Sequence, residues 1–145
     1  MLKQIQADMK QAMKAGDKKQ VSTLRMLIAA IKNESINQRR ELSEEETVTV
    51  INREIKQRRN AIAEFKKGGR DDLAAENEQE IAILERYLPE QLSDEELAAI
   101  VRQAVKEVNA ASLRDMGKVM GRVMPQVKGK ADGTRVQAAV KEILQ

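Results

Sequence analysis

The segment YLPEQLSDEE, Tyr87 to Glu96, predicts a break between two groups of helices, and this break decides the fold. Pro89 disfavours helical backbone at the residue before it and has no N–H for the turn behind it, so a helix must end near Leu88. Ser93 and Glu96 form a capping box, in which both side chains bind backbone N–H groups at the start of a new helix. We therefore predict an N-terminal helical domain over residues 1–88, a linker over 89–92 and a C-terminal domain over 93–145.

Apolar residues recur at helical spacing before this break, and no segment has the alternation of a strand. A second capping box, Ser43 with Glu46, opens a long helix. That helix ends at Lys66-Lys67-Gly68-Gly69, where cations suit the helix dipole and glycine can adopt a left-handed cap. The predicted helices of this part cover residues 2–15, 18–37, 43–67 and 71–87.

After the break the same periodicity predicts shorter helices. The fifth begins at Ser93, the sixth is capped by Ser112 and is stopped or kinked by Pro125, and the seventh is capped by Asp132. The chain is therefore predicted to be all-α, with an N-terminal four-helix part and a small C-terminal three-helix part.

The composition excludes several classes of function. The 145 residues include no cysteine and no histidine, so thiolate catalysis, a Ser-His-Asp relay and most transition-metal sites are unattainable. Phe65 and Tyr87 are the only aromatic residues, too few for the stacking platforms on which proteins read single-stranded bases. No apolar run approaches the ~20 residues of a membrane span, and the amino terminus lacks the apolar core of a signal peptide. We expect a cytoplasmic protein with no membrane partner, no cofactor, no metal and no catalytic residue of its own.

Positive charge is concentrated near the carboxy terminus. Residues 1–90 carry 17 basic and 16 acidic side chains, whereas residues 113–135 carry six basic and two acidic ones. On a helical wheel of about 100° per residue, Arg114, Lys118 and Arg122 lie opposite an apolar arc of leucine, valine and methionine. Gly117 and Gly121 lie on the border between the two sides.

Each of these glycines costs a helix up to about 1 kcal/mol relative to alanine, so we expect something to approach the backbone closely. One interpretation is a neighbouring helix packed against Gly117-x-x-x-Gly121. The other is a nucleic-acid backbone whose phosphates meet Lys118 and Arg122, and the following loop favours it because glycines beside lysines ahead of a helix suit phosphate. The predicted nucleic-acid contacts are Arg114, Lys118, Gly121, Arg122, Lys128, Gly129, Lys130 and Arg135.

A second basic run lies in the long third helix, where Arg58-Arg59 replaces an expected apolar residue of the stripe. Together with Arg53, Lys56 and Lys66 it predicts either a second surface for anionic ligands or a solvated helix face. We prefer the solvated face, because surface charge alone specifies no partner.

Several motifs resemble the GatB/YqeY family. They are Tyr87-Leu-Pro-Glu-Gln-Leu-Ser, Asp115-Met-Gly-Lys-Val-Met-Gly and Pro125-Gln-Val-Lys-Gly-Lys-Ala-Asp-Gly. Thr23-Leu-Arg-Met-Leu and Phe65-Lys-Lys-Gly-Gly-Arg are similar to stand-alone YqeY-type members, so the resemblance covers essentially the whole length.

In larger members of that family the module is the tail of the B subunit of the tRNA-dependent amidotransferase, which converts glutamate or aspartate misacylated on tRNA to the amide. A similar domain precedes some glutaminyl-tRNA synthetases. The resemblance implies tRNA binding by the tail, while a kinase-like cradle domain and a separate amidase subunit, neither of them within these 145 residues, perform the chemistry. It implies phosphate contacts for Lys118, Gly121, Lys128, Gly129 and Lys130.

The leading prediction is a non-catalytic helical module that binds structured RNA, tRNA above all, through backbone and shape contacts. One alternative is a protein-interaction or regulatory module whose glycine and methionine surface docks a partner helix. Another is an accessory part of a carbon–nitrogen ligase that uses glutamine as amido donor. Carboxylate-based hydrolysis would need Glu44-Glu45-Glu46 or Asp71-Asp72, but both clusters lie at predicted helix starts, where the dipole favours acids.

Overall fold

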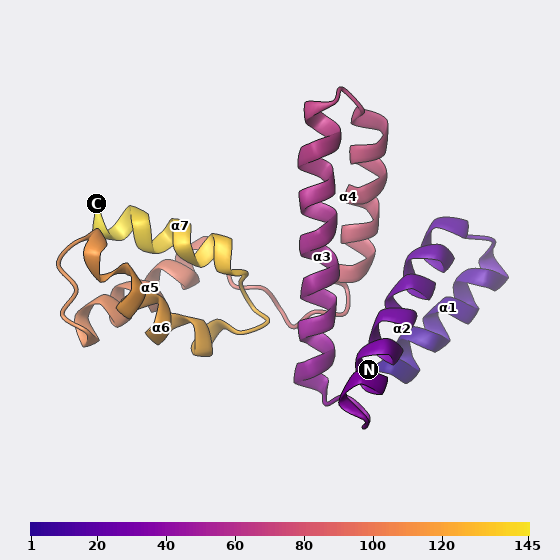
Figure 1. Ribbon diagram of the computed structural model, residues 1–145, viewed down its shortest axis with the longest axis horizontal. Helices are drawn as coiled ribbons and strands as arrows, with labels where there is room; N and C mark the ends of the chain where they lie inside the picture. The colour runs from indigo at the N-terminus through magenta and orange to yellow at the C-terminus, as the bar shows by residue number, and fades with distance from the viewer. The chain divides into compact units, whose positions relative to one another are not determined.

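The computed structural model describes residues 1–145, and the fold is all-α, as the sequence predicts (Figure 1). The chain forms two compact units, Met1–Leu88 and Pro89–Gln145. The first unit contains α1 (Leu2–Ala15), α2 (Lys18–Gln38), α3 (Glu44–Lys67) and α4 (Asp71–Glu85). The second contains α5 (Asp94–Glu107), the short 3-10 helix η1 (Leu113–Asp115), α6 (Met116–Val127) and α7 (Gly133–Leu144).

In the N-terminal unit, α3 lies beside α4 and α1 lies beside α2 (Figure 1). The predicted signals set the helix boundaries: Gly16 ends α1 with φ 72°, and Ser43 and Glu46 form the capping box of α3. Isoleucine and leucine side chains from the four helices form the core, with Ile5, Leu24, Ile51 and Leu84 fully buried. The unit is therefore held together by one apolar face of each helix.

The basic run in α3 is exposed at Arg53, Lys56, Arg59 and Lys66, as a solvated helix face predicts, whereas Arg58 fits neither interpretation. It is only 7% exposed. Its Nη1 donates to the carbonyl of Glu54 at 3.1 Å, its Nε lies 3.6 Å from the carboxylate of Glu80 on α4, and its Nη2 lies 3.8 Å from the sulfur of Met26 on α2. Arg58 therefore belongs to the interior between three helices, where the protein's own carboxylates replace both solvent and an external anion.

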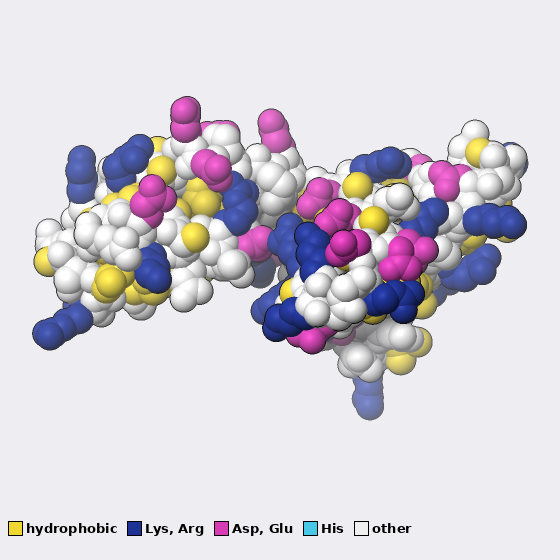
Figure 2. Space-filling view, turned by 90° about the horizontal axis from the view of Figure 1, so that it is seen from above, with side chains coloured by type: hydrophobic (Ala, Val, Ile, Leu, Met, Phe, Trp, Pro, Cys, Tyr) yellow, Lys and Arg dark blue, Asp and Glu magenta, His cyan; other side chains and the backbone are white.

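Three exposed cations of α3 have carboxylate partners. Arg53 lies 3.5 Å from Glu34, and Arg59 lies 3.6 Å from Glu85. Basic and acidic side chains interleave at the end of the α3–α4 hairpin (Figure 2), where Lys66 lies 3.6 Å from Glu78. This surface offers an anionic ligand no cluster of uncompensated positive charge.

The C-terminal unit has a core of small branched side chains. The buried residues come from α5, α6, α7 and the loop before α7 and are Leu97, Val101, Ala104, Val119, Val123, Val127, Ala131, Val136 and Val140. Ser93 and Asp132 cap α5 and α7 as predicted. The predicted linker contacts this unit: the Leu92 N–H donates to the carbonyl of Lys130 at 2.9 Å, and Gln91 Nε2 donates to that of Gly129 at 2.8 Å. These bonds attach residues 91 and 92 to the loop between α6 and α7.

The sixth helix differs from the prediction at both ends. Ser112 caps η1 through a capping box with Asp115, and α6 itself begins at Met116. Pro125 does not stop the helix, which continues to Val127. A proline removes the hydrogen bond to the carbonyl four residues earlier and crowds that carbonyl with its ring, and here the carbonyl belongs to Gly121, whose backbone adjusts most easily. Val127 is fully buried, so packing holds the last turn in the helical conformation.

Candidate nucleic-acid interface

The predicted contact residues on α6 occupy one exposed side of the helix. Its buried row is Val119, Val123 and Val127. Residues four apart lie on the same face, so Gly117, Gly121 and Pro125 form one exposed row and Lys118 and Arg122 form the next, with Arg114 one turn earlier in η1. The structure therefore places a basic row beside a row that has almost no side chains.

The two glycines are open to solvent. A Cβ atom built on Gly117 or on Gly121 would have no atom within 4 Å. No helix of the C-terminal unit covers them, so close packing within this unit does not explain the glycines. Alanine would fit both positions and would favour the helix by up to about 1 kcal/mol each. The C-terminal unit therefore leaves this row of the helix uncovered.

Arg122 and Arg135 are engaged within the chain. The Nε of Arg122 donates to Oε2 of Glu107 at 2.5 Å, and with Gln103 this guanidinium holds the pKa of the Glu107 carboxyl below its usual range. The Nη2 of Arg135 donates to the carbonyl of Leu92 at 2.9 Å and to Oδ1 of Asp94 at 2.8 Å. Arg135 thus links α7 to the start of α5 by hydrogen bonds. The sequence pattern did not indicate this structural role.

The loop between α6 and α7 is held in place by hydrogen bonds and has exposed lysine side chains. Gly129 has φ 79°, and its carbonyl accepts from Gln91. Lys128 and Lys130 are exposed, and they follow directly on the carboxyl end of α6. Asp132 accepts from the N–H of Arg135 at 2.8 Å, which occupies the first turn of α7 with a carboxylate. Any anion at this loop would meet lysine side chains rather than the amides of that helix.

The structure therefore divides the predicted residues into three groups. Arg114, Lys118, Gly121 and Arg122 share the exposed side of α6 and η1, and Lys128, Gly129 and Lys130 form the turn that follows. Arg135 is half-buried and bound to α5. Sequence reasoning missed Glu107 and Asp94, the partners of two of the arginines, because each lies at least 15 residues away along the chain.

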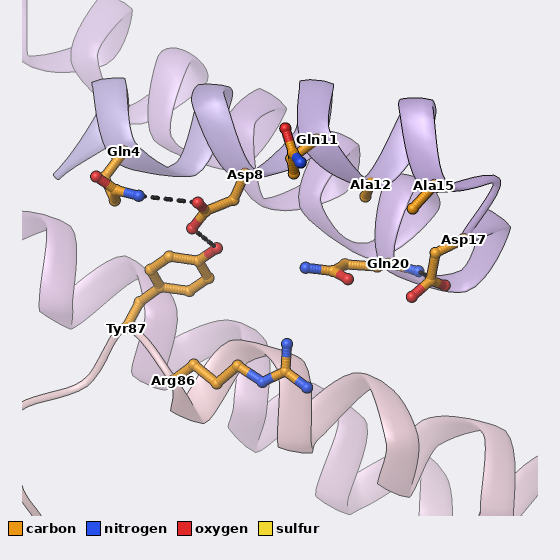
Figure 3. A pocket seen from close by; sticks show the side chains of 9 residues that line it. All are labelled: Gln4, Asp8, Gln11, Ala12, Ala15, Asp17, Gln20, Arg86 and Tyr87. Atoms are coloured by element: carbon orange, nitrogen blue, oxygen red, sulfur yellow. Dashed lines mark hydrogen bonds between the residues drawn. The ribbon is translucent and has the colours of Figure 1, made fainter.

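A polar pocket of about 490 Å³ lies in the N-terminal unit between α1, the start of α2 and the end of α4 (Figure 3). The hydroxyl of Tyr87 donates to Asp8 at 2.5 Å, and Gln4 donates to the other oxygen of Asp8 at 2.8 Å. Burial, and then the Asp8 carboxylate, raise the pKa of Tyr87. Asp17 and Arg86 also line the pocket, so two carboxylates face one guanidinium and the lining has a net negative charge, which opposes an anionic ligand.

The acidic clusters have structural partners at helix starts. Glu46 is in the capping box of α3 and accepts from both terminal nitrogens of Arg40, at 2.6 and 2.7 Å. Asp72, in the first turn of α4, accepts from Arg70. No group of three or more carboxylates is close enough to hold a metal ion. No helix is both long and apolar enough to cross a membrane.

Comparison with known proteins gives one family. A family model described as Yqey-like protein matches residues 2–144. Similar proteins are named "Altered inheritance of mitochondria protein 41, mitochondrial". The protein of that name from Pyrenophora tritici-repentis is 29% identical over 99% of this chain and 81% of its own length. The one from Clavispora lusitaniae is 30% identical over 88% and 74%, and the one from Kluyveromyces lactis is 38% identical over 57% and 45%.

Proposed function

We propose that this chain, which belongs to the Yqey-like protein family by its match over residues 2–144, is a non-catalytic module that binds structured RNA, tRNA in the first place. The binding surface is the exposed side of α6 and η1 together with the turn 128–130. The observation that carries the proposal is the pair of open glycines beside Lys118 and Arg122. A backbone without side chains, flanked by cations, suits a polyanion that must come close to the helix.

Double-helical RNA fits this surface better than single strands do. Its deep, narrow major groove hides the base edges from side chains, so proteins contact its phosphates, riboses and shape. The C-terminal unit, residues 89–145, contains no aromatic residue on which an unpaired base could stack. Contacts to the RNA backbone therefore require only the residues that the exposed side of α6 provides.

The cellular location is a separate proposal. A chain without cysteine suits a reducing compartment. The names of the similar fungal proteins state that those proteins are mitochondrial. We propose the cytoplasm for this chain, and fractionation of cells that produce it would test the assignment.

Titration of the full chain with total tRNA at several salt concentrations tests the proposed function. If about five cations contact phosphate, the slope of log affinity against log salt should be roughly −3 to −5. Lys118→Glu should weaken binding about tenfold and soften the slope by about one. Lys67→Glu is the matched control, since it makes the same charge change at an exposed position of the N-terminal unit.

Three outcomes are decisive. Absence of binding even at low salt rejects RNA binding. Equal losses in the two lysine variants show that RNA does not bind at α6. The alternative is a protein module whose α6 docks a partner helix, because the open glycines beside partly buried Met120 and Met124 also suit a closely packed helix. Binding that does not depend on salt, and that is abolished by Gly121→Leu but not by Lys128→Glu, supports this alternative.

A further inference from the structure

The carbonyl of Gly121 lacks its helical hydrogen-bond donor. In an α-helix each carbonyl accepts from the N–H four residues later. Four residues after Gly121 stands Pro125, which is inside α6 and has no N–H. The next carbonyl, that of Arg122, accepts additionally from Nε2 of Gln126 at 3.0 Å. Gly121 thus presents a backbone acceptor more than one turn before α6 ends at Val127.

This acceptor lies in the middle of the proposed interface. Gly121 is exposed, and no atom lies within 4 Å of the place its Cβ would occupy. Lys118 and Arg122 flank it in the next row of the helix. A ligand held by these two cations therefore comes within reach of the freed carbonyl.

The chemistry of the acceptor restricts the ligand. A carbonyl oxygen only accepts hydrogen bonds, and so does a phosphodiester, so a phosphate cannot bind it. A cationic donor is disfavoured by the neighbouring lysine and arginine. The ligand must therefore carry a neutral donor next to an anionic group. A ribose 2′-hydroxyl is such a donor, every RNA nucleotide carries one beside its phosphate, and DNA has none.

We infer that the Gly121 carbonyl accepts a hydrogen bond from a ribose 2′-hydroxyl, so that α6 distinguishes RNA from nucleic acids that lack this group. The inference rests on the proposed RNA binding. It adds the ligand's donor group and the residue pair, Gly121 and Pro125, that recognises it. The exposed glycine admits the ribose, and the proline keeps the carbonyl available.

The test is a fluorescence titration of the full chain with one RNA hairpin in two forms, unmodified and fully 2′-fluoro. The 2′-fluoro form keeps A-form geometry and phosphates but has no 2′-hydroxyl donor. We expect the wild-type chain to bind the unmodified hairpin about three- to tenfold more tightly, the effect of one hydrogen bond. Pro125→Ala supplies the missing N–H to Gly121 and should reduce the ratio of the two affinities to near unity.

Two controls complete the experiment. Gln126→Ala changes an exposed neighbour and leaves Gly121 without its helical donor, so it should keep the preference. Lys118→Glu should weaken both hairpins by the same factor. An equal affinity of the wild type for the two forms, or a preference that persists in Pro125→Ala, overturns the inference while RNA binding stands. Failure to bind either hairpin overturns the proposed function and this inference with it. Circular dichroism establishes that Pro125→Ala is folded, as alanine favours the helix.

Discussion

The two units contain charge in similar balance and use it differently. Residues 1–88 carry 17 basic and 15 acidic side chains, and residues 89–145 carry nine and eight. In the N-terminal unit carboxylates on neighbouring helices compensate cations such as Arg53 and Lys66, and they surround the buried Arg58. In the C-terminal unit ion pairs engage Arg122 and Arg135. No ion pair within 4.0 Å engages Arg114 or Lys118, although the charge of Lys118 helps to lower the pKa of nearby Asp115. The cations without a close carboxylate partner, rather than the net charge, therefore locate an anion site.

The largest expected effect concerns the buried cation of the N-terminal unit. Arg58→Ala would leave the side chains of Glu54 and Glu80, 15% and 18% exposed, without their shared counter-charge. We expect a loss of about 2–4 kcal/mol in the free energy of unfolding of this unit. Urea unfolding followed by circular dichroism measures the loss.

The matched control is Arg59→Ala. Arg59 is the next residue in α3, its side chain is 48% exposed, and its pair with Glu85 is at the surface. Surface pairs contribute about 0–1 kcal/mol, so the control should unfold close to the wild type. Similar losses of unfolding free energy in both variants would show that buried Arg58 stabilises the unit no more than exposed Arg59 does. Affinity for RNA should not change in either variant, because both residues belong to the other unit.

The next largest effect concerns the exposed glycine backbone of α6. A large side chain there should lower RNA affinity and raise the stability of the C-terminal unit. Gly121→Leu should weaken RNA binding about tenfold, because its side chain separates phosphate from the helix and each tenfold loss is about 1.4 kcal/mol. The same change should stabilise the C-terminal unit by up to about 1 kcal/mol, because leucine favours helix and meets no atom within 4 Å of its Cβ. Tight RNA binding by this variant would mean that RNA does not approach α6 at the glycines.

An exposed residue on another helix of the same unit provides the control. Ala138→Leu places the same side chain on α7 and adds nearly as much bulk, so it should leave RNA affinity within about twofold of the wild type. A loss equal to that of Gly121→Leu would show that the unit tolerates no added apolar bulk, wherever it is placed.

Glu107 tests whether internal pairing limits the binding surface. Glu107→Gln removes the carboxylate that binds Arg122, so we expect RNA affinity to rise about two- to fivefold, with a slope against salt that steepens by up to about one. Arg122 lowers the pKa of Glu107, so the carboxylate is ionised throughout the neutral range and this pair adds no pH dependence there. Glu142→Gln, with the same charge change at the exposed end of α7, should have less effect. Equal gains in RNA affinity in the two variants would show that the change in net charge, and not the release of Arg122, raises affinity.

Local signals in the sequence predict the helices and their ends. The capping boxes at Ser43 and Ser93, the left-handed Gly16 and the cap at Asp132 all depend on residues within a few positions of one another. The exposure of Gly117 and Gly121 also agrees with their place on the helical wheel. Such features follow from backbone geometry, which local sequence controls.

Tertiary contacts account for what the sequence could not predict. Arg58 replaces an apolar residue of its stripe because Glu80, 22 residues later and on another helix, lies opposite it. Asp94 binds Arg135 from a distance of 41 residues along the chain. Pro125 continues α6 because Val127 is buried, which overrides the local preference to stop. In each case the deciding partner lies outside the window that periodicity and capping rules use.

The smallest effect compares the two capping boxes in acid. Hydrogen bonds from Arg40, and then from the Ser43 backbone, lower the pKa of Glu46 from 4.5 to about 2. The stabilisation from this group is therefore complete above about pH 4.5 and is lost as the pH falls toward 2. The pKa of Glu96 is lowered by Ser93 without an arginine. Urea midpoints at about pH 3 and about pH 7 should thus differ less in Glu46→Gln than in the wild type. Glu96→Gln should change the difference between the two urea midpoints less than Glu46→Gln does. An equal change in the two variants would show that Arg40 does not contribute to the acid sensitivity of Glu46.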